Sequence, residues 1–251
     1  MRVKHRIHLK FFIPLFLLFT FLCTSFQFQG STTNTDEIIS FVVDANAQHL
    51  GLYLKNDKGE FFRNFNNLRS FVESKQQTLV FAMNGGMYKK DNMPQGLYIE
   101  NHKVLFPLDT TQGKGNFYLQ PNGIFYITNE KKAVVCQTTS FKYTNNIAYA
   151  TQSGPMLLIN GEIHPAFKQG SVNLNIRNGV GILPDNKILF AMSKKEINFY
   201  DFALYFKNLG CKNALYLDGF VSRMYLPQEK WIQTDGDFGV MIGVTMTKGE
   251  N

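Results

Sequence analysis

The sequence predicts a single α+β or mixed α/β domain with a large mixed β-sheet and few helices. Short apolar segments bounded by turn residues recur along the chain, only two segments have helical periodicity, and these two lie far apart. A repeating strand–helix–strand fold would need a helix after most strands. The chain has 251 residues, of which 44% are hydrophobic and 18% charged, so it can bury a sizeable core.

Five segments have the composition of β-strands, because each is apolar and bounded by Gly, Asn, Asp or Pro. These predicted strands are residues 38–43, 50–54, 78–83, 96–99 and 124–128. Residues 121–123 (Pro-Asn-Gly) and 160–161 (Asn-Gly) predict tight turns between further strands.

Two segments have the period of an amphipathic helix. Residues 65–75 follow Asn64, whose side chain suits an N-cap. Residues 199–209 stop at Gly210, a residue type that ends many helices. The predicted core-facing residues are Phe65, Leu68, Phe71 and Val72 in the first helix and Phe202, Leu204 (in part), Tyr205, Phe206 and Leu209 in the second.

The N-terminal 25 residues have the layout of a secretory signal peptide. Four basic residues precede an apolar run, 11–23, and small side chains place the predicted cleavage near Ser25. A retained membrane anchor and a lipoprotein attached through Cys23 are the alternatives, the second disfavoured by the bulky Leu22. The protein is therefore expected to be secreted or periplasmic, with a disordered lead-in at 26–37 and one domain at 38–251.

Charge and cysteine content narrow the choice of partners. The formal net charge is +7, but without the four basic residues of the leader 22 basic and 19 acidic residues leave +3. This balance gives no indication of nucleic-acid binding. Cys136 and Cys211 could form a disulfide or remain two free thiols. The chain contains no CxxC motif, so we expect no structural zinc site.

Four motifs join polar residues and glycine at predicted strand ends. In the first, Asn84, Gly85 and Gly86 follow strand 78–83. Paired glycines permit a sharp turn whose N–H groups face an anion, with Asn84 as a further donor. A turn without a ligand is the alternative. In the second, Gln152 and Ser153 precede Gly-Pro, where they could bind sugar hydroxyls or lie in a plain loop entering a hairpin.

The third and fourth motifs add charged side chains. Arg177 opens a glycine-spaced strand, where its guanidinium could bind a phosphate or pair with a carboxylate for structural reasons. Asp218 and Gly219 follow four mostly apolar residues, and Ser222 comes shortly after. Strand ends of open α/β sheets often carry ligand-binding residues. A turn-forming Asp-Gly pair is the alternative.

The order of these motifs resembles that of the phosphodiester glycosidase family, over essentially the whole segment after residue 38. The resemblance implies cleavage of a sugar–phosphodiester bond by a bacterial exported enzyme, with a carbohydrate phosphodiester as substrate. It also implies a cleft formed by Asn84, Gly85, Gln152, Arg177, Asp218 and Gly219. One departure affects the substrate: many members have a second glycine after Asp-Gly, whereas this chain has Phe220 and Val221.

We assign the catalytic roles to Asp218, as base or nucleophile at the anomeric carbon, and to Arg177, as a phosphate contact. The predicted substrate-binding residues are Asn84, Gly85, Gly86, Gln152, Ser153, Gly219 and Ser222. No metal ligand is assigned and the sequence requires no cofactor, although a divalent cation could assist. Glu162 and Asp201 are alternative second carboxylates, or simply a hairpin charge and a helix-end charge. His164 is a rim residue or a structural one.

Two other functions remain open at this point. A non-catalytic module that binds envelope glycans would keep the cleft, and Phe220 could stack on a sugar there. A nuclease-like phosphodiesterase would cut the P–O bond instead. In each case we expect no nucleic-acid partner, and membrane contact only if the leader is retained as an anchor.

Overall fold

A computed structural model describes residues 35–218 and 221–248. The predicted signal peptide at 1–25 lies outside the described residues, as do most of the predicted lead-in and the pair Gly219 and Phe220. Residues 35–37 form a 3-10 turn, which differs from the predicted disorder at the end of the lead-in. The described residues belong to one compact unit. No helix in the described ranges is long and apolar enough to cross a membrane.

The described chain contains two α-helices and sixteen β-strands. The helices are α1 (Phe65–Ser74) and α2 (Phe199–Asn208). The strands are β1 (Ile38–Val43), β2 (His49–Tyr53), β3 (Gln77–Asn84), β4 (Tyr98–Glu100), β5 (Lys103–Phe106), β6 (Gly123–Thr128), β7 (Ala133–Gln137), β8 (Ile147–Ser153), β9 (Met156–Ile159), β10 (Glu162–Ile163), β11 (Asn178–Ile182), β12 (Ile188–Ser193), β13 (Ala214–Asp218), β14 (Met224–Leu226), β15 (Trp231–Ile232) and β16 (Met241–Thr247).

The strands form three sheets. The first has the order β1-β12-β11-β13-β9-β10, the second β15-β14-β3-β16-β2 and the third β5-β4-β8-β6-β7. Every strand pairing in the described residues is antiparallel. The α+β class is confirmed, but three antiparallel sheets replace the one large mixed sheet that we predicted. Strand composition does not determine which strands pair, so their division into sheets was not visible in the sequence.

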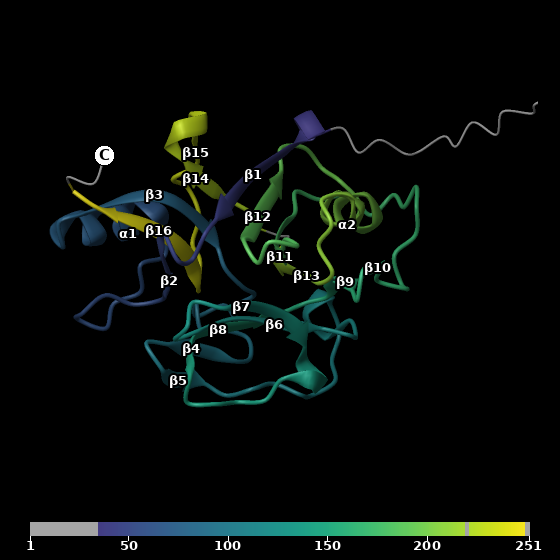
Figure 1. Cartoon of the computed structure of the whole chain (residues 1–251), viewed down its shortest axis with the longest axis horizontal. Helices are drawn as coiled ribbons and strands as arrows, with labels where there is room; N and C mark the ends of the chain where they lie inside the picture. The colour runs from purple at the N-terminus through teal and green to yellow at the C-terminus, as the bar shows by residue number, and fades with distance from the viewer. Residues whose placement is uncertain (1–34, 219–220, 249–251) are drawn as a thin grey trace, which may run out of the picture. The chain divides into compact units, whose positions relative to one another are not determined.

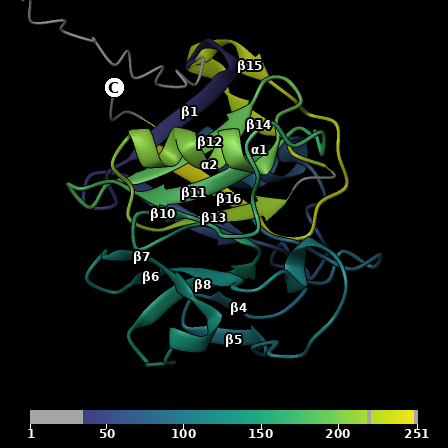
Figure 2. The ribbon, with the colours of Figure 1, turned by 90° about the vertical axis from the view of Figure 1, so that its right-hand side faces the viewer.

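Each helix packs against one sheet, as Figures 1 and 2 show for α2 and the six-stranded sheet. The predicted cap of α1 is confirmed, because the Asn64 side chain accepts the Asn67 N–H at 3.0 Å. The α2 helix ends at Asn208, and Gly210 follows with a φ of 82°. One predicted core residue is wrong: Leu209 is the C-cap and is 41% exposed, because it lies beyond the last helical turn.

A central hydrophobic cluster joins the three sheets. Phe190 of β12 contacts Phe81 of β3 and Phe125 of β6, with ring centroids 5.3 and 5.8 Å apart. All three rings are fully buried. Burying one such side chain stabilises a fold by roughly 1.5–3 kcal/mol. This core therefore fixes the sheets relative to one another, and with them the strand ends that carry the site.

The two cysteines are free thiols in the structure. Cys211 is buried and Cys136 is half-buried. Burial raises the pKa of the Cys136 thiol to about 11 and that of Cys211 to about 12. Of the two alternatives left open by the sequence, the structure shows the pair of free thiols.

Candidate active site

A buried amide network joins Asp218, the last residue of β13, to two asparagines. The Asn84 side chain donates to Asp218 Oδ2 at 3.2 Å, and the Asp218 backbone N–H donates to Asn178 Oδ1 at 2.9 Å. Asn178 in turn donates to Asn84 Oδ1 at 2.9 Å. Asn84 and Asn178 are fully buried, and Asp218 is 6% exposed. These hydrogen bonds hold Asp218 in place through its carboxylate and its backbone N–H.

Two serines hold the backbone on either side of this carboxylate. Ser153 Oγ donates to the Leu217 carbonyl at 2.7 Å, and Ser222 Oγ donates to the Asp218 carbonyl at 2.6 Å. Both serines are buried. Asn84 ends β3, Ser153 ends β8, Asn178 begins β11 and Asp218 ends β13, so termini of strands from all three sheets meet here.

Asp218 lines an open cleft of about 370 Å³. The other residues that line this cleft are Met87, Tyr88, Lys89, Lys90, Gln95, Asn116 and Val221. Its wall therefore combines a carboxylate, two amides, a phenol and two lysines. These groups could bind sugar hydroxyls and an anionic group side by side.

Tyr88 is the cleft phenol and remains protonated. Burial, followed by the negative charges of Asp218 and Asp237, raises the pKa of Tyr88 to about 12. A phenol with this pKa is neutral at physiological pH and keeps an O–H that can donate a hydrogen bond. Tyr88 was not among the residues predicted from the sequence.

The two glycines of the first motif have a packing role in the structure. A Cβ on Gly86 would lie 2.6 Å from Thr151 Oγ1, and one on Gly85 would lie 2.8 Å from Ile242 Cγ1. The Gly85 N–H donates to the Val240 carbonyl at 2.8 Å. This N–H is thus used within the protein, and the close approach of neighbouring strands explains both glycines.

Gln152 is 1% exposed, and protein groups occupy both ends of its amide. Its oxygen accepts the backbone N–H groups of Leu97 and Asp109, each at 2.9 Å. Its nitrogen donates to the Asp109 carbonyl at 2.6 Å. Gln152 therefore positions the segment around residue 109. Its predicted contact with substrate stays a prediction.

Arg177 directly precedes β11, and its side chain has other partners than that of Asn178, which contacts Asn84. Its guanidinium donates to the Ile197 carbonyl at 2.7 Å, the Asn173 carbonyl at 2.9 Å and Tyr216 Oη at 3.3 Å. It also stacks on the Phe199 ring, 3.6 Å from the ring centroid. None of these partners lines the cleft. The catalytic role predicted for Arg177 stays a prediction, and the contacts favour a structural role.

The alternative carboxylates and the histidine have local partners. Asp201 accepts from the Asn198 side chain at 2.7 Å at the start of α2, and exposed Glu162 pairs with Lys207 at 2.8 Å. His164 is buried, and its Nδ1 accepts the Ala166 N–H at 3.2 Å, so Nε2 carries the proton donated to the Gln120 carbonyl. These contacts support a helix-end role for Asp201, a hairpin charge at Glu162 and a structural role for His164.

No cluster of three or more His, Cys, Asp or Glu side chains that could hold a metal ion occurs in the described ranges. Of the predicted site residues, the structure brings together Asn84, Ser153, Asp218 and Ser222, whereas Gln152 and Arg177 have other partners. The residues that were not predicted from the sequence include Tyr88, Asn178 and the two lysines after the first motif. Asn178 directly follows Arg177, and the lysines directly follow Met87 and Tyr88.

Comparison with known proteins decides the family. Residues 77–244 match the family model of phosphodiester glycosidases. The chain belongs to the phosphodiester glycosidase family. The matched segment runs from the first residue of β3 to the middle of β16, and so contains the whole network around Asp218.

Individual relatives and solved structures resemble this chain to different degrees. The Escherichia coli K12 protein YigE, which is uncharacterized, is 38% identical over 188 residues, or 74% of this chain and 73% of YigE. The zebrafish N-acetylglucosamine-1-phosphodiester alpha-N-acetylglucosaminidase catalytic domain, auto-inhibited by its pro-peptide, has a TM-score of 0.54 at 16% identity, covering 83% of this chain and 82% of that one. A hypothetical protein from Synechocystis has a TM-score of 0.52 at 11% identity, covering 83% and 59%. These two structures show a shared fold.

Proposed function

We propose that the protein is an exported hydrolase that cleaves a sugar-1-phosphodiester and releases a free sugar and a phosphomonoester. The observation that carries the proposal is the Asp218 carboxylate, held by Asn84 in a cleft of about 370 Å³. Membership of the phosphodiester glycosidase family supports the same reaction class. The zebrafish enzyme of similar fold is named for an N-acetylglucosamine-1-phosphodiester, so that sugar is the first candidate.

The chemistry of the leaving group explains how a single carboxylate can be enough. Ordinary glycosidases use two carboxyl groups, one of which protonates a poor leaving alcohol. A phosphomonoester has a second pKa of about 6, so it departs with little help from an acid. The bond between C1 and the phosphate oxygen breaks, and its electron pair stays on the phosphate oxygen.

Asp218 acts at the anomeric carbon in one of two ways. As a nucleophile, it forms a covalent bond to C1 that water then hydrolyses, which retains the anomeric configuration. As a base, it takes a proton from a water that attacks C1 directly, which inverts that configuration. The configuration of the first-formed sugar, observed by NMR, distinguishes the two.

The export part of the proposal rests on residues 1–25, where basic residues precede a short apolar run. A secreted or periplasmic protein of this kind would act on extracellular glycans or exopolysaccharides. N-terminal sequencing of the protein recovered from its own cells is expected to show a mature chain that begins near residue 26. A mature chain that begins at Met1 and stays with the cytoplasmic fraction would overturn this part.

A substrate panel tests the reaction. The purified protein is incubated with α- and β-linked sugar-1-(methyl phosphate) diesters of N-acetylglucosamine, glucose, galactose and mannose, and methyl phosphate is measured. We expect one or more diesters to yield free sugar and methyl phosphate in equal amounts. Binding to a diester without any product would identify a glycan-binding module instead, and sugar phosphate with methanol would identify a P–O-cleaving phosphodiesterase.

A further inference from the structure

One segment supplies most of the cleft wall. After β3, residues 87–95 form a narrow hairpin, closed by the Lys89 N–H to the Met93 carbonyl at 2.8 Å and the Gln95 N–H to the Met87 carbonyl at 2.9 Å. We call residues 87–95 the cleft hairpin. Five of the eight cleft-lining residues belong to it: Met87, Tyr88, Lys89, Lys90 and Gln95.

The cleft hairpin places two positive charges in the same cleft as the carboxylate of Asp218. Lys89 and Lys90 are both exposed and both line the cleft. Among the described residues, neither lysine forms an ion pair. With Asp218, the charged side chains of the cleft give a net charge of +1. A phosphodiester carries one negative charge, so this distribution attracts it despite the carboxylate.

A buried turn residue anchors the cleft hairpin to the rest of the fold. Asn92 is 2% exposed and has a left-handed φ of 62°. Its side-chain nitrogen donates to Asp237 Oδ1 at 2.9 Å, the Asp237 carbonyl at 3.2 Å and the Phe238 carbonyl at 3.1 Å. The amide of one side chain thus ties the hairpin to the segment that leads into β16.

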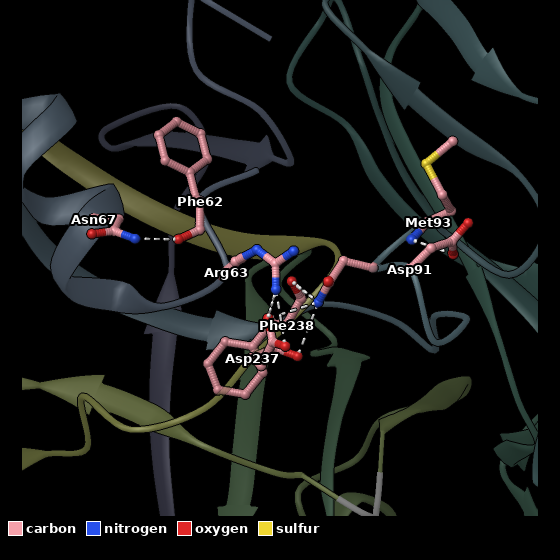
Figure 3. Close-up of polar contacts among 8 residues, drawn as sticks. Phe62, Arg63, Asn67, Asp91, Met93, Asp237 and Phe238 are labelled. Carbon is pink, nitrogen blue, oxygen red and sulfur yellow. Dashed lines mark hydrogen bonds and ion pairs between the residues drawn. The ribbon is translucent and has the colours of Figure 1, made fainter. Parts of the chain in front are cut away.

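Asp237, which accepts the hydrogen bond from Asn92, is itself held in place by Arg63. Arg63, just before α1, donates from Nη1 to both oxygens of Asp237 at 3.0 and 3.1 Å. Figure 3 shows Arg63 facing Asp237 and Phe238, with Asp91 and Met93 of the cleft hairpin nearby. The Phe238 N–H also donates to the Arg63 carbonyl at 2.6 Å.

Direct backbone packing adds to the anchor. A Cβ on Gly239 would lie 2.7 Å from the Cβ of Tyr88 and 2.8 Å from the carbonyl oxygen of Asn92. The cleft hairpin therefore packs directly against the backbone at Gly239. Two independent contacts, the Asn92 amide and the Gly239 surface, determine where the hairpin residues lie.

We propose that the cleft hairpin is the phosphate subsite, in which Lys89 and Lys90 bind the anionic oxygens and Asn92 is a positioning residue. The proposal rests on the proposed function for the identity of the anion. A lysine binds phosphate as a point charge, so its contribution depends on where its backbone is held. Nothing in this assignment requires Arg177, whose guanidinium is engaged elsewhere.

The test compares the double variant Lys89→Ala/Lys90→Ala with a matched control, Lys194→Ala/Lys195→Ala. The control removes two adjacent exposed lysines at the end of β12, outside the cleft. Calorimetry measures the Kd for inorganic phosphate at two salt concentrations, and kinetics measure KM and kcat for the best diester. In the hairpin variant we expect Kd and KM to rise about tenfold, since loss of two partly screened charges weakens binding by about that factor.

Asn92→Gly tests the positioning role, because glycine permits the left-handed backbone and lacks the side-chain amide. We expect Kd for phosphate and KM to rise about tenfold, with kcat changed less than about threefold and with a weaker salt dependence of Kd than in the wild type. A structural role alone would lower the melting temperature without changing the salt dependence. That result, or unchanged Kd and KM, would overturn the positioning role.

The outcomes separate this inference from the proposed function. If the wild type hydrolyses a diester and the hairpin double variant behaves like the control, the subsite is wrong and the function stands. If the wild type binds phosphate through the lysines but cleaves no diester, the subsite stands and the proposed reaction is wrong.

Discussion

Replacing Asp218 with asparagine is expected to lower kcat/KM on a sugar-1-phosphodiester by about 10³-fold or more. In the proposed mechanism the carboxylate reacts at the anomeric carbon or activates the water, and an amide can do neither. The shape of the site survives the change, because an asparagine oxygen can still accept from Asn84 and the backbone N–H can still donate to Asn178. Steady-state kinetics with melting temperatures in parallel measure both effects.

Asp185→Asn is the matched control for this variant. Asp185 lies on the surface, paired with Lys187 at 2.8 Å, so its loss removes a carboxylate without touching the cleft. We expect kcat/KM of this control to equal that of the wild type. An Asp218→Asn protein that keeps its activity would show that another group carries the reaction.

Replacing Arg177 with alanine is expected to lower the free energy of unfolding by about 3–5 kcal/mol and the melting temperature by about 10 °C. The change removes the guanidinium donor from the Asn173 carbonyl and leaves the Ile197 carbonyl with the Asn175 N–H alone. It also removes the guanidinium that stacks on the Phe199 ring. Loss of these hydrogen bonds and an empty volume in the core are both costly. Thermal and urea unfolding measure the loss.

Arg177→Lys distinguishes this structural role from the catalytic role predicted from the sequence. Lysine keeps the positive charge but lacks the planar fork, so we expect a stability between those of the wild type and the alanine variant. At a temperature where it is folded, its kcat/KM should lie within about tenfold of the wild type. A lysine variant of full stability whose activity is lost would instead support a catalytic Arg177.

The local elements of the fold could be predicted because their signals are local. Residues 38–43 match β1 without error, and the Asn64 cap and the start of both helices were visible in a few consecutive residues. The sheets could not be predicted in the same way. Strand β3 pairs with β16, whose residues lie more than 150 positions further along the chain, and no local pattern records that pairing.

The site could be predicted in part, where its residues lie in local sequence motifs. Motif order along the chain identified Asn84 and Asp218, which the structure joins by a hydrogen bond. The sequence did not show that Asn178, rather than the neighbouring Arg177, contacts Asn84, because this contact joins strands from two different sheets. In the sequence, Lys89 and Lys90 cannot be distinguished from two ordinary solvent-exposed lysines. Their place in the cleft depends on the hydrogen bond between Asn92 and Asp237, which lies far away in the sequence.

Hydrolysis in ¹⁸O-labelled water tests the central claim most directly, namely that Asp218 directs attack at the anomeric carbon of a sugar phosphodiester. Mass spectrometry of both products locates the label. We expect ¹⁸O to enter the released sugar and to be absent from the phosphomonoester, and we expect the Asp218→Asn protein to form neither product at a comparable rate. Label in the phosphomonoester would show that the P–O bond is cut and would contradict attack at the anomeric carbon.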